Sequence, residues 1–172
     1  MDGISLSIQD LLNDNEYGLG LSLLAGEQGL SHRVSSSRIQ KPGLALAGYS
    51  EHLHPDRVQV LGNTEISYLQ QIDSRVAAEN IAALCNFPIS CFVVTKNLRP
   101  PQLLLDLAGS HAIPVLATAH QSSTFISLIT KFLEEQLLPT THLHGVLMDV
   151  LGVGVLISGK AASAKVNVPS IL

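Results

Sequence analysis

Three short apolar runs mark the middle of the chain. Residues 89–95 (ISCFVVT) and 113–118 (IPVLAT) are uninterrupted and rich in β-branched side chains, a pattern typical of strands buried on both faces. A run formed by Val58, Val60 and Leu61 predicts another strand, which ends at the glycine that follows it.

Between and after these strands, apolar residues recur with the period of a helix. Two consecutive helices are expected over residues 63–85, with Asp73 or Ser74 as the cap of the second. The segment PPQLLLDLAGS predicts a third helix, with prolines at its start and a glycine at its end. In the fourth, one stripe has helical spacing: Phe125, Leu128, Ile129, Phe132 and Leu133. Strands alternating with helices predict an α/β fold, with a small, mainly parallel sheet and helical crossovers.

The first 60 residues have a weaker pattern. Residues 7–13 predict a short helix capped by Ser5 or Ser7. Extended segments joined by a turn near Gly26 to Gly29 follow, and Pro42 with its neighbouring glycine is expected to stop regular structure.

A domain boundary is predicted at Leu138-Pro139-Thr140-Thr141, because proline disfavours continuation of the last helix. Residues 1–138 are then the N-terminal α/β domain, and residues 139–172 the incomplete start of a second domain. In that second part, HLHGVLMDVLGVGVLISG predicts a β-hairpin hinged around Leu151-Gly152.

Composition narrows the classes of partner and compartment. The 172 residues carry a formal net charge of −4 and no basic run, so a nucleic-acid partner is not expected. The start of the chain has no basic signal region, and the longest apolar stretch, residues 146–157, is well short of the ~20 residues of a membrane helix. Cys85 and Cys91 lie in apolar stretches without a CxxC spacing, typical of buried thiols in a reducing compartment. We therefore expect a cytoplasmic protein with no membrane partner.

Residues 159–166 match part of a phosphate loop. The template G-x-x-x-x-G-K-[ST] needs glycines for close approach of backbone amides, a lysine for the phosphates and a hydroxyl for magnesium. Here Gly159 and Lys165 fit, whereas Ala164 replaces the second glycine and Val166 replaces the hydroxyl residue. The amide cradle and the magnesium ligand are thus both compromised.

The other polar residues considered give weaker indications of a catalytic or metal-binding site than the phosphate-loop match does. His142 and His144 lie two apart on a predicted strand, where they face one side. No third ligand follows at a recognisable spacing, so no metal site is predicted. The serine runs at 35–37 and 122–123 fit turn and capping roles, since no Gly-x-Ser-x-Gly elbow is present.

Four segments resemble the N-terminal part of bacterial HPr kinase/phosphorylase: KPGLALAGY (41–49), VLGNTEISYL (60–69), IPVLAT (113–118) and HGVLMDVLGVGVLISG (144–159). The resemblance implies a first domain similar to the N-terminal domain of muramoyl-peptide ligases, followed by a hairpin that begins a phosphate-loop kinase domain assembling into hexamers. It also implies a transferase that uses ATP or pyrophosphate, with magnesium, to phosphorylate a serine of the phosphocarrier HPr. Such an enzyme reverses that step with inorganic phosphate and regulates carbon metabolism through the phosphotransferase system.

The resemblance also assigns site residues. It places His144 at the family's active-site histidine, Gly159 at the first glycine of the phosphate loop and Lys165 at its lysine, and it puts Val166 where the family has its magnesium-binding serine. We hypothesise that residues 160–172 are an out-of-frame tail, because losing one base after the Gly159 codon converts a family-like loop into this sequence. We therefore expect the chain alone to bind neither ATP nor magnesium and to be catalytically inactive.

Three functions remain open from the sequence. The first is a non-catalytic regulatory or structural module of a truncated HPr kinase/phosphorylase, and the second is a genuine kinase whose catalytic half is supplied elsewhere. The third is a stand-alone module that binds a small ligand at the carboxyl ends of the parallel strands, near Thr95 and Thr118. Apolar strands in the predicted hairpin also favour self-association.

Overall fold

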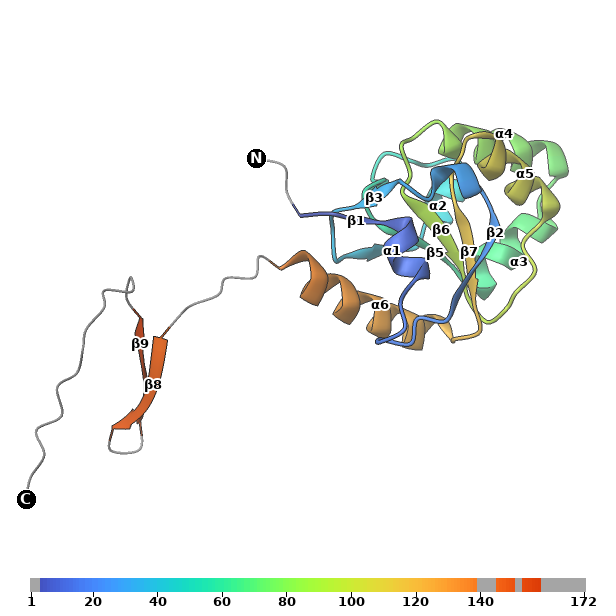
Figure 1. Ribbon diagram of the computed structural model, residues 1–172. Coiled ribbons are helices and arrows are strands. Elements are labelled where there is room, and N and C mark those ends of the chain that lie inside the picture. Colours follow the sequence, from blue (N-terminus) through green and yellow to red (C-terminus); the bar gives the residue numbers. More distant parts are fainter. Residues whose placement is uncertain (1–3, 139–144, 151–152, 159–172) are drawn as a thin grey trace, which may run out of the picture. The chain divides into compact units, whose positions relative to one another are not determined.

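The computed structural model describes residues 4–138, 145–150 and 153–158, and of the last two segments mainly the backbone (Figure 1). The chain divides into two compact units, Met1–Leu138 and Pro139–Leu172, and each is described by itself.

A five-stranded sheet forms the centre of the first unit, in the order β2-β7-β6-β5-β4 (Figure 1). Strands β4 to β7 are mutually parallel, and β2 pairs antiparallel with β7 at one edge. A separate two-stranded sheet joins β1 to β3. The strands are β1 (Leu6–Ser7), β2 (Leu21–Ala25), β3 (Arg33–Val34), β4 (Ile39–Gln40), β5 (Val58–Leu61), β6 (Cys91–Val94) and β7 (Val115–Thr118). This is the mainly parallel α/β sheet that the sequence predicts.

Six α-helices and one short 3-10 helix are described in this unit. They are α1 (Ile8–Leu12), η1 (Glu27–Gly29), α2 (Gly43–Leu46), α3 (Asn63–Gln71), α4 (Ser74–Cys85), α5 (Gln102–Ser110) and α6 (Ser122–Leu137). The four helices predicted between residues 63 and 137 are all present. Asp73 caps α4 as expected, with its carboxylate accepting from the amides of Arg75 and Val76.

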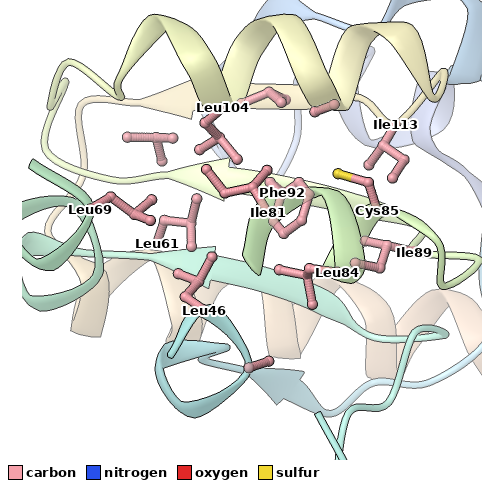
Figure 2. Packing of buried hydrophobic residues seen from close by; sticks show 14 of the residues in the cluster. Leu46, Leu61, Leu69, Ile81, Leu84, Cys85, Ile89, Phe92, Leu104 and Ile113 are labelled. Carbon is pink, nitrogen blue, oxygen red and sulfur yellow. The ribbon is translucent and has the colours of Figure 1, made fainter. Parts of the chain in front are cut away.

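Helices cover the sheet on both faces, and each face has its own apolar core. Side chains alternate across β6. Phe92 (Figure 2) and Val94 pack under α2 to α5, whereas Cys91 and Val93 pack against α1 and α6. Every residue of β5, β6 and β7 is buried. Burial on both sides explains why β6 and β7 read as continuous apolar runs, whereas β5 also buries the polar Gln59.

The turn at Gly26 to Gly29 is present, but the segments that it joins do not pair with each other. β2 pairs with β7, and β3 pairs with β1. Gly26 has φ +78°, and an added Cβ there would lie 2.1 Å from the Ile113 carbonyl oxygen. Packing against the start of β7, rather than hairpin formation, therefore fixes this turn.

The expectation that Pro42 stops regular structure is wrong in part. β4 ends at Gln40, and helix α2 begins directly after Pro42, which is its N-cap residue. A proline lacks an amide hydrogen, and the first amides of a helix have no partner within the helix, so it is tolerated there.

In the second unit, β8 (Gly145–Val150) and β9 (Val153–Ser158) pair antiparallel, with Val150 opposite Val153. This confirms the predicted hairpin, although its hinge residues, 151–152, lie outside the described residues. Within the described part of the chain, no helix has both the length and the apolar character needed to cross a membrane.

Candidate functional site

The carboxyl ends of β4, β5, β6 and β7 meet at one edge of the sheet, where ligands of open α/β sheets commonly bind. Lys41, Gly62 and Thr95 follow directly after β4, β5 and β6. Glu65 joins them from the first turn of α3, and Ser122 from the first turn of α6. We call these five residues the carboxyl-edge cluster.

Glu65 is the centre of the cluster. Its side chain is only 5% exposed, and its Oε2 accepts a hydrogen bond from the Gly62 amide at 2.9 Å. The same oxygen lies 3.4 Å from Nζ of Lys41, which is 45% exposed. The carboxylate therefore satisfies an amide at the start of α3 and links this helix to the end of β4.

Gly62 leaves room for three polar side chains. A Cβ added there would lie 2.8 Å from the Ser122 hydroxyl oxygen, 3.5 Å from Glu65 Oε2 and 3.6 Å from Lys41 Nζ. A side chain at position 62 would thus displace the Ser122 hydroxyl, which bonds to Thr95.

The two threonines singled out in the sequence lie at this edge, and both hydroxyls are engaged within the chain. Thr95 Oγ1 lies 2.7 Å from the Ser122 hydroxyl and 3.3 Å from the Leu61 carbonyl. Thr118 Oγ1 donates to the Leu19 carbonyl at 3.0 Å. Both threonines are buried. Thr95 thus ties the end of β6 to β5 and α6, and Thr118 ties the end of β7 to the segment before β2.

The described residues show no activated nucleophile at this edge. The Ser122 hydroxyl bonds to that of Thr95, and a serine hydroxyl needs an adjacent base to attack a substrate. Ser122 also differs from its expected role, because Gln121 is the N-cap of α6. Burial raises the pKa of the Cys85 thiol to about 11 and that of Cys91 to about 12, so both thiols stay protonated and unreactive.

Sequence reasoning missed Lys41 and Glu65. A signal was available, since glycine is a favoured N-cap residue and a glutamate three residues later can accept from the N-cap amide. The pairing of Glu65 with Lys41 had no such signal, because it depends on β4 lying beside β5.

The residues assigned by resemblance to the active site, His144, Gly159 and Lys165, lie outside the described residues, as do His142 and Val166. In the part of the chain that is described, no group of three His, Cys, Asp or Glu side chains lies close enough to hold a metal ion. The carboxylate of Glu65 is already bound to an amide and a lysine. The assignment of His144, Gly159 and Lys165 therefore stays a prediction.

Comparison with known proteins decides the family. The family model described as HPr Serine kinase N terminus matches residues 6–133. The chain belongs to the HPr serine kinase N-terminal family. The matched segment begins at β1 and ends within α6, so it covers the whole described sheet and both of its cores.

A curated relative from Geobacter sulfurreducens, named HPr kinase/phosphorylase, is 70% identical over 165 residues. The alignment covers 96% of this chain and 52% of the relative, so the chain spans about half the length of that protein. This identity supports assignment of the chain as the N-terminal part of an HPr kinase/phosphorylase.

Similar solved structures include the CBS and DRTGG domains of the regulatory region of Clostridium perfringens pyrophosphatase, complexed with the activator diadenosine tetraphosphate. It covers 70% of this chain and 44% of that one, with a TM-score of 0.41 and 22% sequence identity. A likeness this distant does not bear on the function of the chain.

Proposed function

We propose that this chain is the N-terminal regulatory and structural module of an HPr kinase/phosphorylase, and that it does not transfer phosphate by itself. The observation that carries the proposal is the extent of the family match. Residues 6–133 lie within the unit that ends at Leu138, whereas the residues assigned to phosphate chemistry come after it. Residues 139–172 then correspond to the start of the kinase domain.

The proposed lack of activity follows from the phosphate-loop sequence. Phosphoryl transfer needs loop amides, a lysine, a bound metal and a base acting together. Ala164 and Val166 stand where a glycine and a magnesium-binding hydroxyl belong. ATP, magnesium and the phosphocarrier HPr are thus ligands of the complete enzyme in this proposal, and this chain alone binds neither ATP nor magnesium.

Two experiments test the proposal. In the first, the purified chain is incubated with ATP, magnesium and HPr, and intact-mass spectrometry of HPr is expected to show no added phosphate. In the second, residues 1–138 replace the matching region of the Geobacter sulfurreducens relative, and this chimera is expected to phosphorylate HPr. Phosphoserine formed by the chain alone, or a folded but inactive chimera, would overturn the proposal.

Self-association and location complete the proposal. The hairpin of β8 and β9 is a sheet of two strands, and such a sheet is rarely stable without further packing. We therefore expect the hairpin to self-associate, and size-exclusion chromatography is expected to give a larger assembly for the full chain than for a version ending at Leu138.

We place the module in the cytoplasm with no nucleic-acid or membrane partner, because both cysteines are free thiols and the sequence has no basic run.

A further inference from the structure

A groove lies between strand β2, helix α5 and the loop that follows Thr95 at the carboxyl end of β6. It has a volume of about 410 Å³, with walls from β2, from the loop at residues 97–100 and from α5. Small-molecule sites typically have volumes of about 300–1,000 Å³. The groove is thus large enough for a small organic ligand.

Leucine side chains form the apolar part of the groove, which Ser22, Asn97 and Gln102 also line. β2 is an edge strand (Figure 1), and its Leu24 side chain is 42% exposed. Leu98 and Leu105 line the groove from the loop and from α5, and both are half-buried. These three leucines offer a hydrocarbon surface that a ligand would remove from water, which is favourable by roughly 25 cal/mol per Å² of apolar area.

A single cation gives the groove its charge. Arg99 lines it, is exposed, and forms no ion pair with any described residue. No aspartate or glutamate lines the groove, although the chain as a whole is acidic. The nearby Asp106 of α5 does not line the groove, and its carboxylate accepts a hydrogen bond from Gln102 at 2.8 Å. The groove therefore favours an anion.

The loop that carries Arg99 is held in place by its backbone. The Asn97 amide donates to the Thr118 carbonyl at 3.0 Å, and the Arg99 carbonyl accepts from the Gln70 side chain at 3.3 Å. Asn97 has φ +49°, a left-handed conformation that asparagine tolerates. A fixed loop lowers the cost of ordering the site when a ligand binds.

Two other pockets lack this combination. The pocket beside Lys41 has a volume of only about 100 Å³, below the usual range for small-molecule sites. A pocket of about 400 Å³ next to α1 is lined by Asp10, Asp14 and Glu16, which disfavour an anion. Size, apolar walls and positive charge come together in the groove between β2 and α5.

We propose that this groove binds a small amphipathic anion, whose hydrocarbon part packs on Leu24, Leu98 and Leu105 and whose carboxylate or phosphate bonds to Arg99. A guanidinium presents its N–H groups in a fork that matches both kinds of anion. The proposal does not depend on the kinase assignment, because it concerns binding by this chain alone.

The test is a titration of the ¹⁵N-labelled full chain followed by NMR. Hexanoate and hexyl phosphate are the two anionic probes, hexanamide is the neutral match, and inorganic phosphate is the anion without a hydrocarbon part. We expect at least one amphipathic anion to give saturable shifts at the amides of Ser22, Leu24, Asn97 and Leu105, with a Kd of about 1 mM or tighter. Comparison of the two anions shows whether the groove prefers a carboxylate or a phosphate.

Variants separate the groove from general charge effects. Arg99→Gln is expected to weaken binding at least ~10-fold, whereas Arg75→Gln, at an exposed arginine of α4, is expected to leave it unchanged. Leu24→Ser reports on the apolar wall, and unchanged spectra elsewhere show that each variant is folded. The proposal is wrong if neither amphipathic anion saturates the groove or if Arg99→Gln binds as well as the wild type. It also fails if hexanamide or inorganic phosphate binds as tightly as the amphipathic anions.

Discussion

Gly26 is the residue at which backbone conformation and packing most clearly require glycine. It has φ +78°, and a Cβ would lie 2.1 Å from the Ile113 carbonyl oxygen, a backbone atom with little freedom to move. We expect Gly26→Ala to destabilise the fold by about 3 kcal/mol or more, because strain and a steric clash act together. Urea unfolding followed by circular dichroism measures this loss.

Gly18 provides the matched control. Its φ is +70°, similar to that of Gly26, but a Cβ there meets nothing within 4 Å. Gly18→Ala is expected to cost only about 1–2 kcal/mol, the strain of a left-handed alanine. Equal losses for the two variants would show that the contact with Ile113 does not restrict this turn.

Within the carboxyl-edge cluster, Glu65 and Lys41 are expected to contribute unequally. Glu65→Ala leaves the Gly62 amide without its acceptor inside a buried region, and we expect a loss of about 2 kcal/mol. Lys41→Gln removes only a 3.4 Å contact from a side chain that is 45% exposed, and we expect less than about 1 kcal/mol. Urea unfolding midpoints compare the two, and an equal or larger loss for Lys41→Gln would contradict this ranking.

Among the elements, the short helix α1 depends on its capping box. The Ser7 amide donates to Asp10 Oδ2 at 2.8 Å, and the Asp10 amide donates to the Ser7 hydroxyl at 3.1 Å. Hydrogen bonds from the Ser7 side chain and amide hold the pKa of Asp10 below its ordinary value of 3.8. Because the folded pKa is depressed, this contribution is present above 3.8 and is lost as pH falls through the lower, folded value.

We therefore expect Asp10→Ala to cost about 1 kcal/mol at neutral pH and progressively less in acid. Unfolding midpoints measured across the acid range, from neutral pH to below 3.8, test this trend. Asp56→Ala, at an exposed loop position, is the control and is expected to cost almost nothing at either end. A cost for Asp10→Ala that does not change with pH would contradict a role for the ionised carboxylate.

Elements whose signal is local were predictable from the sequence, and those fixed by distant contacts were not. The apolar run of β6 and the apolar stripe of α6 each predict, from neighbouring residues alone, which side chains are buried. By contrast, β4 has two residues, and its pairing with β5 gives no local pattern. β2 pairs with β7, although 89 residues of the chain lie between Ala25 and its partner Val115. The carboxyl-edge cluster was missed for the same reason, since its members lie after different strands and in the first turns of α3 and α6.

At the scale of the whole molecule, the five-stranded sheet contributes side chains to two apolar cores, one on each face. The same strands send Phe92 toward α2 to α5 and Val93 toward α1 and α6. Removing the helices from either face would expose apolar side chains of strands that the other core also needs. We therefore expect the two faces to unfold together, as small domains commonly do.

The two cysteines report on the two faces separately. Cys85 packs in the core under α2 to α5, and Cys91 packs in the core against α1 and α6. The Cys91→Ala variant keeps only the Cys85 thiol, and the Cys85→Ala variant keeps only the Cys91 thiol. Each is expected to resist a thiol reagent in the native state at about pH 8, because burial keeps both pKa values well above that pH.

With increasing urea, labelling of each thiol should begin only where circular dichroism shows that the same variant unfolds. Comparing each variant with its own unfolding curve removes the effect of the cysteine replacement on stability. If one thiol is labelled while the circular dichroism is still native, that face opens by itself and the sheet does not couple the two cores. Coincident transitions for both variants would mean that a ligand stabilising one face also stabilises the other, since both depend on the same folded sheet.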